Sequence, residues 1–193
     1  AALADPTLKI AIDRTTGTAE KKRAAALLDF PQFEAARERG KRIKDHVIAN
    51  LEHYLLEFER NATASGATVH WAATADEASN IVVALCREAG AKRVTRVKSM
   101  LGEEIGLPHA LDAAGIERVE TDLAEHIVQL GGDRPSHIIW PSMHRTREQV
   151  SAMFKREHRQ PHEEETISAM VGSARRELRD KFLSADVSIS GAN

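Results

Sequence analysis

From Gly66 onward the chain alternates short runs of β-branched residues with longer amphipathic segments, and this alternation restricts the fold more than any other feature. One run and one segment together take roughly 20–25 residues, the length of a strand followed by a crossover helix. The sequence therefore predicts an α/β fold with an open, mostly parallel sheet that carries helices on both faces. The expected strands are residues 68–72, 93–97, 116–121, 137–140 and 186–190.

Capping residues mark the helices between these strands. Thr74, Asp122 and the Thr146/Gln149 pair are typical of helix starts, and Gly90, Gly115 and Gly131-Gly132 of helix ends. The expected helices run from Thr74 to Gly90, over most of 99–114, over 123–130, after Thr146 and over 163–182. The last helix is expected to bury Ile167, Met170, Val171, Leu178 and Phe182.

The N-terminal third of the chain is predicted to be helical. A short helix is expected over 20–28 and a long amphipathic helix over 44–61, with one apolar face formed by Val47, Ile48, Leu51, Tyr54, Leu55 and Phe58. The charge-dense residues 37–42 form either a solvated helix face or a docking surface. We therefore expect a helical extension over residues 1–64 and an α/β core over 65–193.

Both ends of the chain are expected to be cut. The first residue is not Met, and residues 188–193 continue a β-branched alternation without a closing turn or helix. The α/β core is therefore expected to be truncated at its C-terminal end.

Composition narrows the possible partners and cofactors. With 27 Lys and Arg against 29 Asp and Glu, the net charge of −2 argues against nucleic acid and against an anionic membrane as partners. The single cysteine, Cys86, excludes an intrachain disulfide and an iron–sulfur cluster held by this chain, and it is expected to be a buried, inert thiol. No secretory signal and no run of about 18 apolar residues is present, so we expect a cytoplasmic protein.

Polar residues follow the predicted strands at the edge of the sheet where ligands bind in open α/β folds. The candidate ligand-binding residues are Lys98, Ser99, Glu103, Glu104, Asp122 and His144. Ser99 and Asp122 are alternatively helix caps, and Glu103 complements a helix dipole. Lys98 has no such explanation, because a cation beside a helix N-terminus is mildly unfavourable. The expected ligand is an anionic acyl or phosphate-bearing small molecule, whereas no residue can be assigned as catalytic.

Three other histidines carry weaker signals. His109 is expected to be structural. His158 and His162 have the i, i+4 spacing of a helical metal pair, but Pro161 lies between them and breaks the helix that would align them. No metal site is predicted from these residues, and neither a GxGxxG fingerprint nor a P-loop is present.

Several long segments resemble one known family. They are residues 97–105, 113–116, 119–123, 129–138 and 184–193, together with 66–71. The resemblance extends from near Lys21 to Asn193, so it covers nearly the whole chain. On these segments the chain resembles the lactate utilization protein B family.

The resemblance implies a LUD domain, related in fold to the sugar-phosphate isomerase and CoA-transferase group. In that family the domain precedes a ferredoxin-like region whose cysteines hold 4Fe–4S clusters, and the longer protein works with two companion proteins in oxidising L-lactate to pyruvate. The cluster cysteines of that region are not among these 193 residues. The resemblance therefore implies an N-terminal domain of an iron–sulfur electron-transfer subunit, inactive by itself and without a cofactor of its own.

Two other functions stay open at this point. The domain could itself bind a small anionic molecule at the Lys98 and Ser99 rim, as an enzyme or a binding protein. Alternatively, it could be an assembly module that uses the helix around Leu51, Tyr54 and Phe58 as a partner interface.

Overall fold

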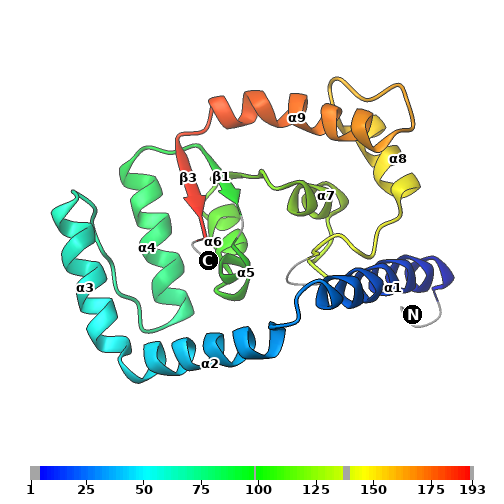
Figure 1. Cartoon of the computed structure of the whole chain (residues 1–193). Helices are drawn as coiled ribbons and strands as arrows, with labels where there is room; N and C mark the ends of the chain where they lie inside the picture. Colours follow the sequence, from blue (N-terminus) through cyan, green and yellow to red (C-terminus); the bar gives the residue numbers. More distant parts are fainter. Residues whose placement is uncertain (1–4, 98, 137–139, 192–193) are drawn as a thin grey trace. The chain divides into compact units, whose positions relative to one another are not determined.

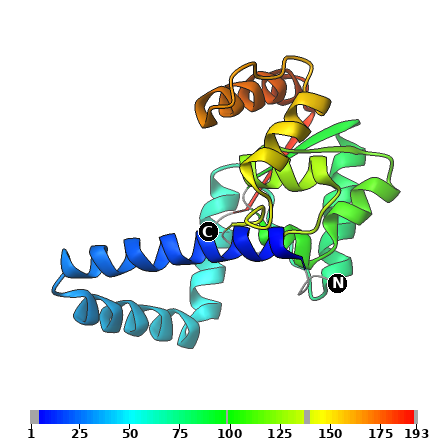
Figure 2. The same cartoon turned by 90° about the vertical axis from the view of Figure 1, so that its right-hand side faces the viewer.

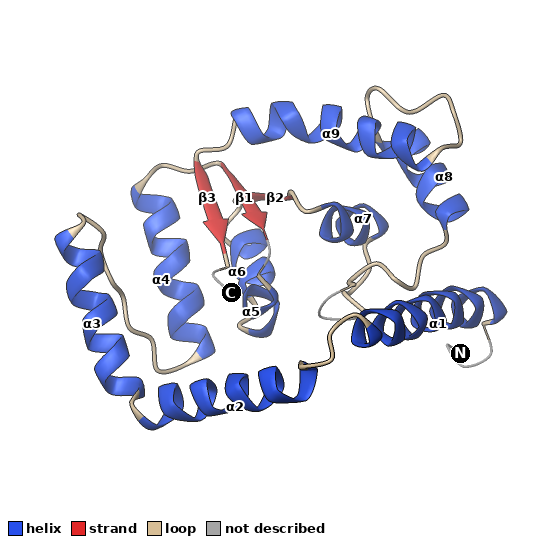
Figure 3. Ribbon diagram, viewed as in Figure 1, coloured by secondary structure: helices blue, strands red, loops and turns tan. Residues whose placement is uncertain are grey.

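The computed structural model describes residues 5–97, 99–136 and 140–191 of the chain. The chain divides into two compact units, one made of Ala1–Asp13 with Ala72–Asn193 and the other of Arg14–Trp71. Figures 1 and 3 trace the helices and strands along the chain.

The described part of the first unit contains a parallel sheet of three strands, β1 (Arg93–Val97), β2 (Glu117–Glu120) and β3 (Val187–Ser190). Their order is β2-β1-β3, with Thr95 of β1 opposite Val119 of β2 and Ser188 of β3. Helices connect consecutive strands, as parallel pairing requires (Figure 3). The prediction of an α/β fold with an open, parallel sheet is confirmed.

The central strand β1 is covered on both faces. Side chains of neighbouring strand residues point to opposite faces, yet Val94, Thr95 and Arg96 are all buried. Apolar packing explains the burial of Val94. It contacts a cluster contributed by α4 (Ala75–Glu88) and α6 (Leu107–Ala113), whose members include Val83, Cys86 and Leu111. This cluster is the core that holds the sheet to its helices.

A second apolar cluster joins three helices, α7 (Leu123–Gly131), α8 (Arg147–Glu157) and α9 (Ile167–Leu183). Phe154 of α8 is almost fully buried in this cluster, which also includes Ile127 of α7 and Met170 of α9. Figure 2 shows α8 and α9 from the side, and α8 packs against both of its neighbours. Ile167 and Phe182 were expected to be buried but are exposed. They lie near the two ends of α9, whereas the α9 members of this cluster are Met170 and Ala174.

The predicted helix caps of the first unit are confirmed. Thr74 Oγ1 accepts from Glu77 N at 3.2 Å, and Thr146 with Gln149 makes the reciprocal capping box. Gly132, at φ +62°, adopts the left-handed conformation that terminates α7. These helix ends are determined locally, by side chains that satisfy the free backbone groups of the first or last turn.

One predicted helix of the first unit is divided. The segment 99–114 forms α5 (Met100–Glu104) and α6, because Gly106 takes a left-handed backbone at φ +70° and starts a new helix. Glycine adopts this conformation without steric cost, so the chain can turn here. The last helix is also shorter than predicted. It begins at Ile167, where Thr166 Oγ1 accepts from Ala169 N at 3.1 Å.

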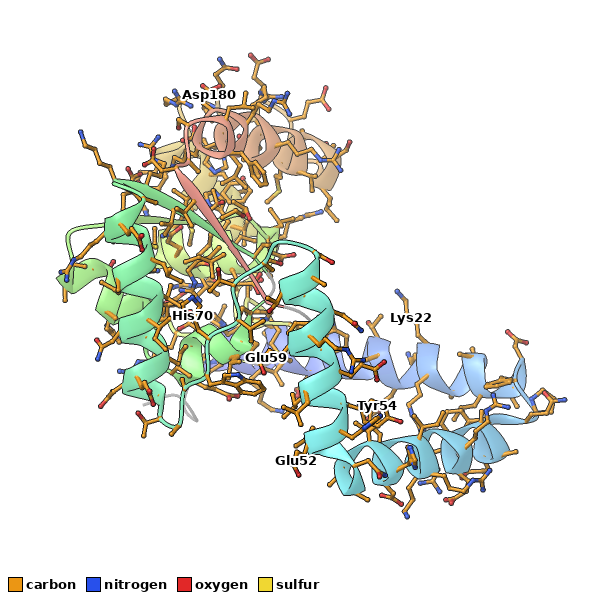
Figure 4. All side chains as sticks on the ribbon, turned by 90° about the vertical axis from the view of Figure 1, so that its left-hand side faces the viewer. Lys22, Glu52, Tyr54, Glu59, His70 and Asp180 are labelled. Carbon is orange, nitrogen blue, oxygen red and sulfur yellow. The ribbon has the colours of Figure 1, made fainter. Side chains whose placement is uncertain are left out.

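The second unit is built from α1 (Pro6–Leu28), of which it takes the part from Arg14 onward, α2 (Phe33–Ala49) and α3 (Leu51–Ala64). The continuous helix predicted over 44–61 is wrong, because the helix stops at Asn50. The Asn50 amide donates to the backbone oxygen of His46 at 2.8 Å, a local bond that competes with the helical pattern. Across the break, His46 Nε2 and Tyr54 Oη are 2.9 Å apart, and Figure 4 labels Tyr54 on α3.

One predicted strand is not found, and another lies mostly outside the described residues. Residues 68–72 form no strand; instead Trp71 Nε1 donates to Glu59 Oε1 of α3 at 2.9 Å, within the second unit. This bond connects the segment to a helix rather than to the sheet. For the strand predicted over 137–140, residues 137–139 lie outside the described residues, and Trp140 is not in a strand.

Candidate functional site

A buried arginine lies near the carboxyl end of β1. Arg96 is only 3% exposed, and its guanidinium meets two carboxylates. Nη2 lies 3.0 Å from Glu103 Oε1 of α5, and Nη1 lies 2.9 Å from Glu120 Oε1 of β2. Because burying an unpaired charge is costly, these two carboxylates are what makes Arg96 tolerable in the interior.

Strand register places Glu120 in this arrangement. Arg96 and Glu120 are direct neighbours in the parallel β1–β2 ladder, so their side chains leave the sheet on the same face. Arg118, two residues earlier on β2, lies 3.6 Å from Glu120 through Nη1 and 3.0 Å from Asp112 through Nε. Burial raises the pKa of Glu120, although Arg96 opposes the change.

A second pair of carboxyl groups stands at the start of α7, just after β2. Asp122 is the N-cap, with Oδ1 accepting from Ala124 N at 3.0 Å. The Glu125 carboxyl stands one turn later and interacts with the Asp122 carboxyl. Burial, followed by this interaction, raises the pKa of Glu125 to about 7. Near neutral pH Glu125 is thus able both to give and to take a proton.

Of these groups, Glu103, Arg118, Glu120 and Glu125 line one cavity of about 550 Å³, a volume typical of small-molecule sites. Its walls come from α5, α6, β2, α7 and the loop that follows α7. The lining residues are Met100, Glu103, Pro108, His109, Arg118, Glu120, Glu125, Val128, Gln129, Gly132, Asp133, Arg134 and Pro135. We call this cavity the strand-end cleft.

Two connections stiffen the walls of the strand-end cleft. The Gln129 amide bridges α7 to β2, accepting from Glu120 N at 3.0 Å and donating to Arg118 O at 2.8 Å. In the loop after α7, Arg145 donates two hydrogen bonds to Asp133, at 2.7 and 2.6 Å. Burial opposes ionisation of Asp133, but its hydrogen bonds outweigh that effect and hold its pKa below the usual range.

Only some of the predicted site residues lie at the strand-end cleft. Lys98 lies outside the described residues. Glu103 lines the strand-end cleft, whereas Glu104 is exposed and is not among its lining residues. Ser99 is a helix cap whose Oγ accepts from Gly102 N at 3.1 Å.

Asp122 and His144 each reach the strand-end cleft through another residue. Asp122 contacts the lining residue Glu125. His144 Nε2 is 3.1 Å from Asp133 Oδ2, and its Nδ1 is 2.9 Å from Ser136 Oγ. His144 is therefore held in place by two partners rather than being a free loop histidine.

Sequence reasoning missed most of the charged groups in the strand-end cleft. Arg96 stands in an apolar strand, at the position that shares a face with Val94, and such a charge is a signal of pairing. The Asp122-x-x-Glu125 spacing was also readable, as a capping-box pattern. By contrast, Arg134 carries no sequence signal, because only the fold brings its loop to the cleft.

His158 and His162, which follow α8, are both buried but contact different partners. His158 Nε2 lies 3.2 Å from His126 Nε2 of α7, and His158 Nδ1 lies 2.7 Å from Ser173 Oγ of α9. His162 Nε2 instead lies 2.9 Å from Ser151 Oγ. Burial lowers the pKa of His126 to about 4 and also lowers the pKa of His158. His126 and His158 are therefore neutral core groups.

The described residues do not fit an iron–sulfur cluster. Cys86 is 1% exposed inside α4, and burial raises the pKa of its thiol, as predicted for an inert core cysteine. In the described ranges no group of three or more His, Cys, Asp or Glu side chains is arranged to hold a metal ion. None of the helices described in the structure is both long and apolar enough to cross a membrane.

Comparison with known protein families finds one match, the LUD domain, over residues 55–193. The chain is 35% identical to the uncharacterized electron transport protein YkgF of Escherichia coli K12 over 98% of its own length and 40% of that protein. It is 36% identical to lactate utilization protein B of Bacillus cytotoxicus, over 89% of this chain and 36% of that protein. The same named protein of Macrococcus caseolyticus is also 36% identical, over 99% and 40%.

The chain thus spans about two fifths of the length of these relatives. No solved structure matches the chain.

Proposed function

This chain belongs to the LUD domain family, and on that premise we propose that it is the N-terminal domain of an iron–sulfur electron-transfer protein that serves L-lactate utilization. One observation carries the proposal. Relatives named lactate utilization protein B and electron transport protein match 89–99% of this chain at 35–36% identity. The chain covers only 36–40% of those proteins, and we propose that the redox centres belong to the remainder of such a longer protein.

In this proposal the domain is a scaffold and docking surface, and it works with two companion lactate-utilization proteins in the cytoplasm. The single buried cysteine, which has no partner for a disulfide, supports an intracellular location. The 4Fe–4S clusters are held outside these residues, since Cys86 is enclosed in the core around Val94 and Leu111.

The test is iron and acid-labile sulfide per chain, measured under anaerobic conditions. Two proteins are compared: the 193-residue chain and the product of the uninterrupted reading frame that encodes it. We expect several irons per longer product and none in the shorter chain. A longer product without iron, or a reading frame that ends near Asn193, contradicts the electron-transfer function.

Small-molecule binding in the strand-end cleft is the second candidate function. It is favoured by the 550 Å³ cavity at the edge of the sheet where α/β proteins bind ligands. The ligand residues proposed from the sequence are Lys98, Ser99, Glu103, Glu104, Asp122 and His144. Of these, Glu103 lines the cleft, and Asp122 and His144 contact lining residues. If a small anion raises the melting temperature, Lys98→Ala should abolish that stabilisation. Unchanged stabilisation removes Lys98 from the site.

A further inference from the structure

The second unit contains two helix faces that are apolar but not buried. On α2 the face is formed by residues that recur at intervals of three and four: Phe33, Ala36, Gly40, Ile43 and Val47. On α3 it is formed by Leu51, Tyr54, Leu55, Phe58 and Ala62. None of these residues is buried, and Ile43 and Phe58 are 58% and 62% exposed. We call them the α2 face and the α3 face.

The α2 face is bordered by uncompensated positive charge. Arg39 lies between Ala36 and Ile43 at helical spacing, and Lys44 lies three residues before Val47, so the two cations border the face on opposite sides. Both are exposed and have no ion-pair partner among the described residues. The acidic residues of α2 pair instead with other cations of the same helix.

The α3 face is bordered by uncompensated negative charge. Glu52 and Glu59 lie seven residues apart, which places them on one side of this face, and Figure 4 labels both on α3. Glu52 is exposed and has no ion-pair partner in the described part of the chain. Glu59 accepts from Trp71 Nε1 at 2.9 Å, but this neutral donor leaves the charge of Glu59 in place. The borders of the two faces are therefore complementary in charge.

Within one chain the two faces cannot pack against each other. Consecutive helices lie antiparallel only when a loop of about two to five residues lets the chain reverse. Here Asn50 alone caps the end of α2 and the start of α3. Figures 1 and 2 show that α3 leads away from α2 at this point. The helices of a second copy approach from outside and do not have this restriction.

We propose that the second unit is a homodimerisation surface, in which the α2 face of each copy packs on the α3 face of the other. A two-fold axis makes the two contacts equivalent. In both of them the cations Arg39 and Lys44 meet the carboxylates Glu52 and Glu59, whereas pairing α2 with α2 or α3 with α3 would oppose like charges. This inference is independent of the electron-transfer role and of ligand binding in the strand-end cleft.

The association should be weak and should depend on concentration. The two faces belong to helices of 17 and 14 residues, so the interface is small. We expect a dissociation constant on the order of micromolar. Dilute protein is then monomeric and exchanges the amides of α2 and α3 rapidly, and the protection of these amides should rise with protein concentration.

The experiment is sedimentation equilibrium of the intact gene product, at concentrations from well below to well above the expected dissociation constant. Two variants reverse the charge at one face each. Arg39→Glu with Lys44→Glu makes the border of the α2 face acidic. Glu52→Lys with Glu59→Gln makes the border of the α3 face basic, and the glutamine keeps an acceptor for Trp71.

Each charge variant alone should self-associate about tenfold or more weakly than the unaltered protein, because both contacts of its dimer join like charges. An equimolar mixture of the two should associate again, since every contact of the mixed dimer joins opposite charges. This rescue is specific to the pairing of α2 with α3. A loss of folding in either variant cannot produce it.

The apolar part of the interface has its own test. Phe58→Ser should weaken self-association by about tenfold or more, because it removes a large exposed side chain from the α3 face. Phe182→Ser is the matched control, at a phenylalanine of α9 that is 55% exposed and lies in the first unit, and it should leave self-association unchanged.

Three outcomes would overturn the inference. The first is a monomer at every concentration, and the second is self-association that ignores both charge variants or is not rescued by mixing them. The third is protection of α2 and α3 from hydrogen exchange only when a companion protein is added, which would mean that these faces bind another partner. The iron and sulfide measurement decides the electron-transfer function separately in each case.

Discussion

Arg96 shows how a single side chain connects the sheet to the strand-end cleft. Its guanidinium is buried on the central strand and reaches both a helix carboxylate, Glu103, and a neighbouring-strand carboxylate, Glu120. Gly102 is part of the same fit, since a Cβ there would lie 2.9 Å from Arg96 Nη2. The buried charge is therefore a packing element as well as an electrostatic one.

Replacing Arg96 by methionine, which has a similar length but no charge, should leave Glu120 buried without its main partner. We expect a loss of about 3–5 kcal/mol in the free energy of unfolding, measured by urea denaturation. Arg93→Met is the control, because Arg93 lies on the same strand but pairs with Glu117 at the surface and should cost at most about 1 kcal/mol. Equal losses in the two variants would mean that the ion pairs of Arg96 have no special role.

At the level of elements, the α7–α8–α9 layer has its own core and its own titrating groups. Phe154 stacks on His158, with ring centroids 4.2 Å apart, and His158 in turn stacks on His126. His158, the first residue after α8, is therefore buried, and its Nδ1 lies within hydrogen-bond distance of Ser173 Oγ.

Phe154→Ala should destabilise the protein by about 3–5 kcal/mol, because it removes a fully buried ring and leaves a cavity. Phe182→Ala is the matched control at a phenylalanine of α9 that is 55% exposed, and it should cost less than about 1 kcal/mol. Chemical denaturation of both variants measures the difference. A small effect of Phe154→Ala would contradict a well-packed second cluster.

Acidification should weaken this layer. The pKa of His126, lowered by burial to about 4, lies below its usual value of 6.5, so the unfolded chain takes up protons first as pH falls. The stabilising contribution is complete above pH 6.5 and is lost progressively from there to about pH 4. His126→Gln removes this group. Between pH 7 and pH 5 the variant should lose about 2 kcal/mol less than the unaltered protein in urea unfolding. Identical pH slopes would show that His126 does not titrate in this range.

For the whole molecule, the contrast between the two compact units matters most. The first unit contains the sheet and both apolar clusters, whereas α2 and α3 have no buried residue. Ile48, Leu51 and Phe58 are 70, 48 and 62% exposed. The apolar residues predicted from the periodicity to form a buried face are therefore largely exposed, and no other part of the second unit covers them.

Hydrogen exchange should reflect this contrast. Short helices without buried apolar contacts are marginal in water, so amides of α2 and α3 should exchange much faster than those of β1 and α6. Mass spectrometry of peptides from the intact protein gives the comparison. Protection of α2 and α3 equal to that of the sheet would mean that a partner or another copy covers their apolar faces in solution.

The sequence was sufficient to predict the features that depend only on neighbouring residues in the chain, such as strands and helix caps. Strand β1, the caps at Thr74 and Asp122, and the capping box at Thr146 follow from β-branched runs and from side chains that bond the first turn of a helix. The spacing of these elements also determined the parallel sheet, because parallel strands need crossover helices.

Contacts between distant segments decided the rest. The pairing of Arg96 with Glu120 depends on strand register. Residues 68–72 form no strand, and their Trp71 instead bonds to Glu59. Arg134 lines the strand-end cleft because of the position of the loop after α7. The sequence alone determined the order and type of most elements and the family, since these depend on local pattern and on matching runs of residues. The tertiary structure alone decided which charges are buried, which are paired and which remain free for a ligand, because burial and electrostatic compensation depend on distances that no spacing along the chain contains.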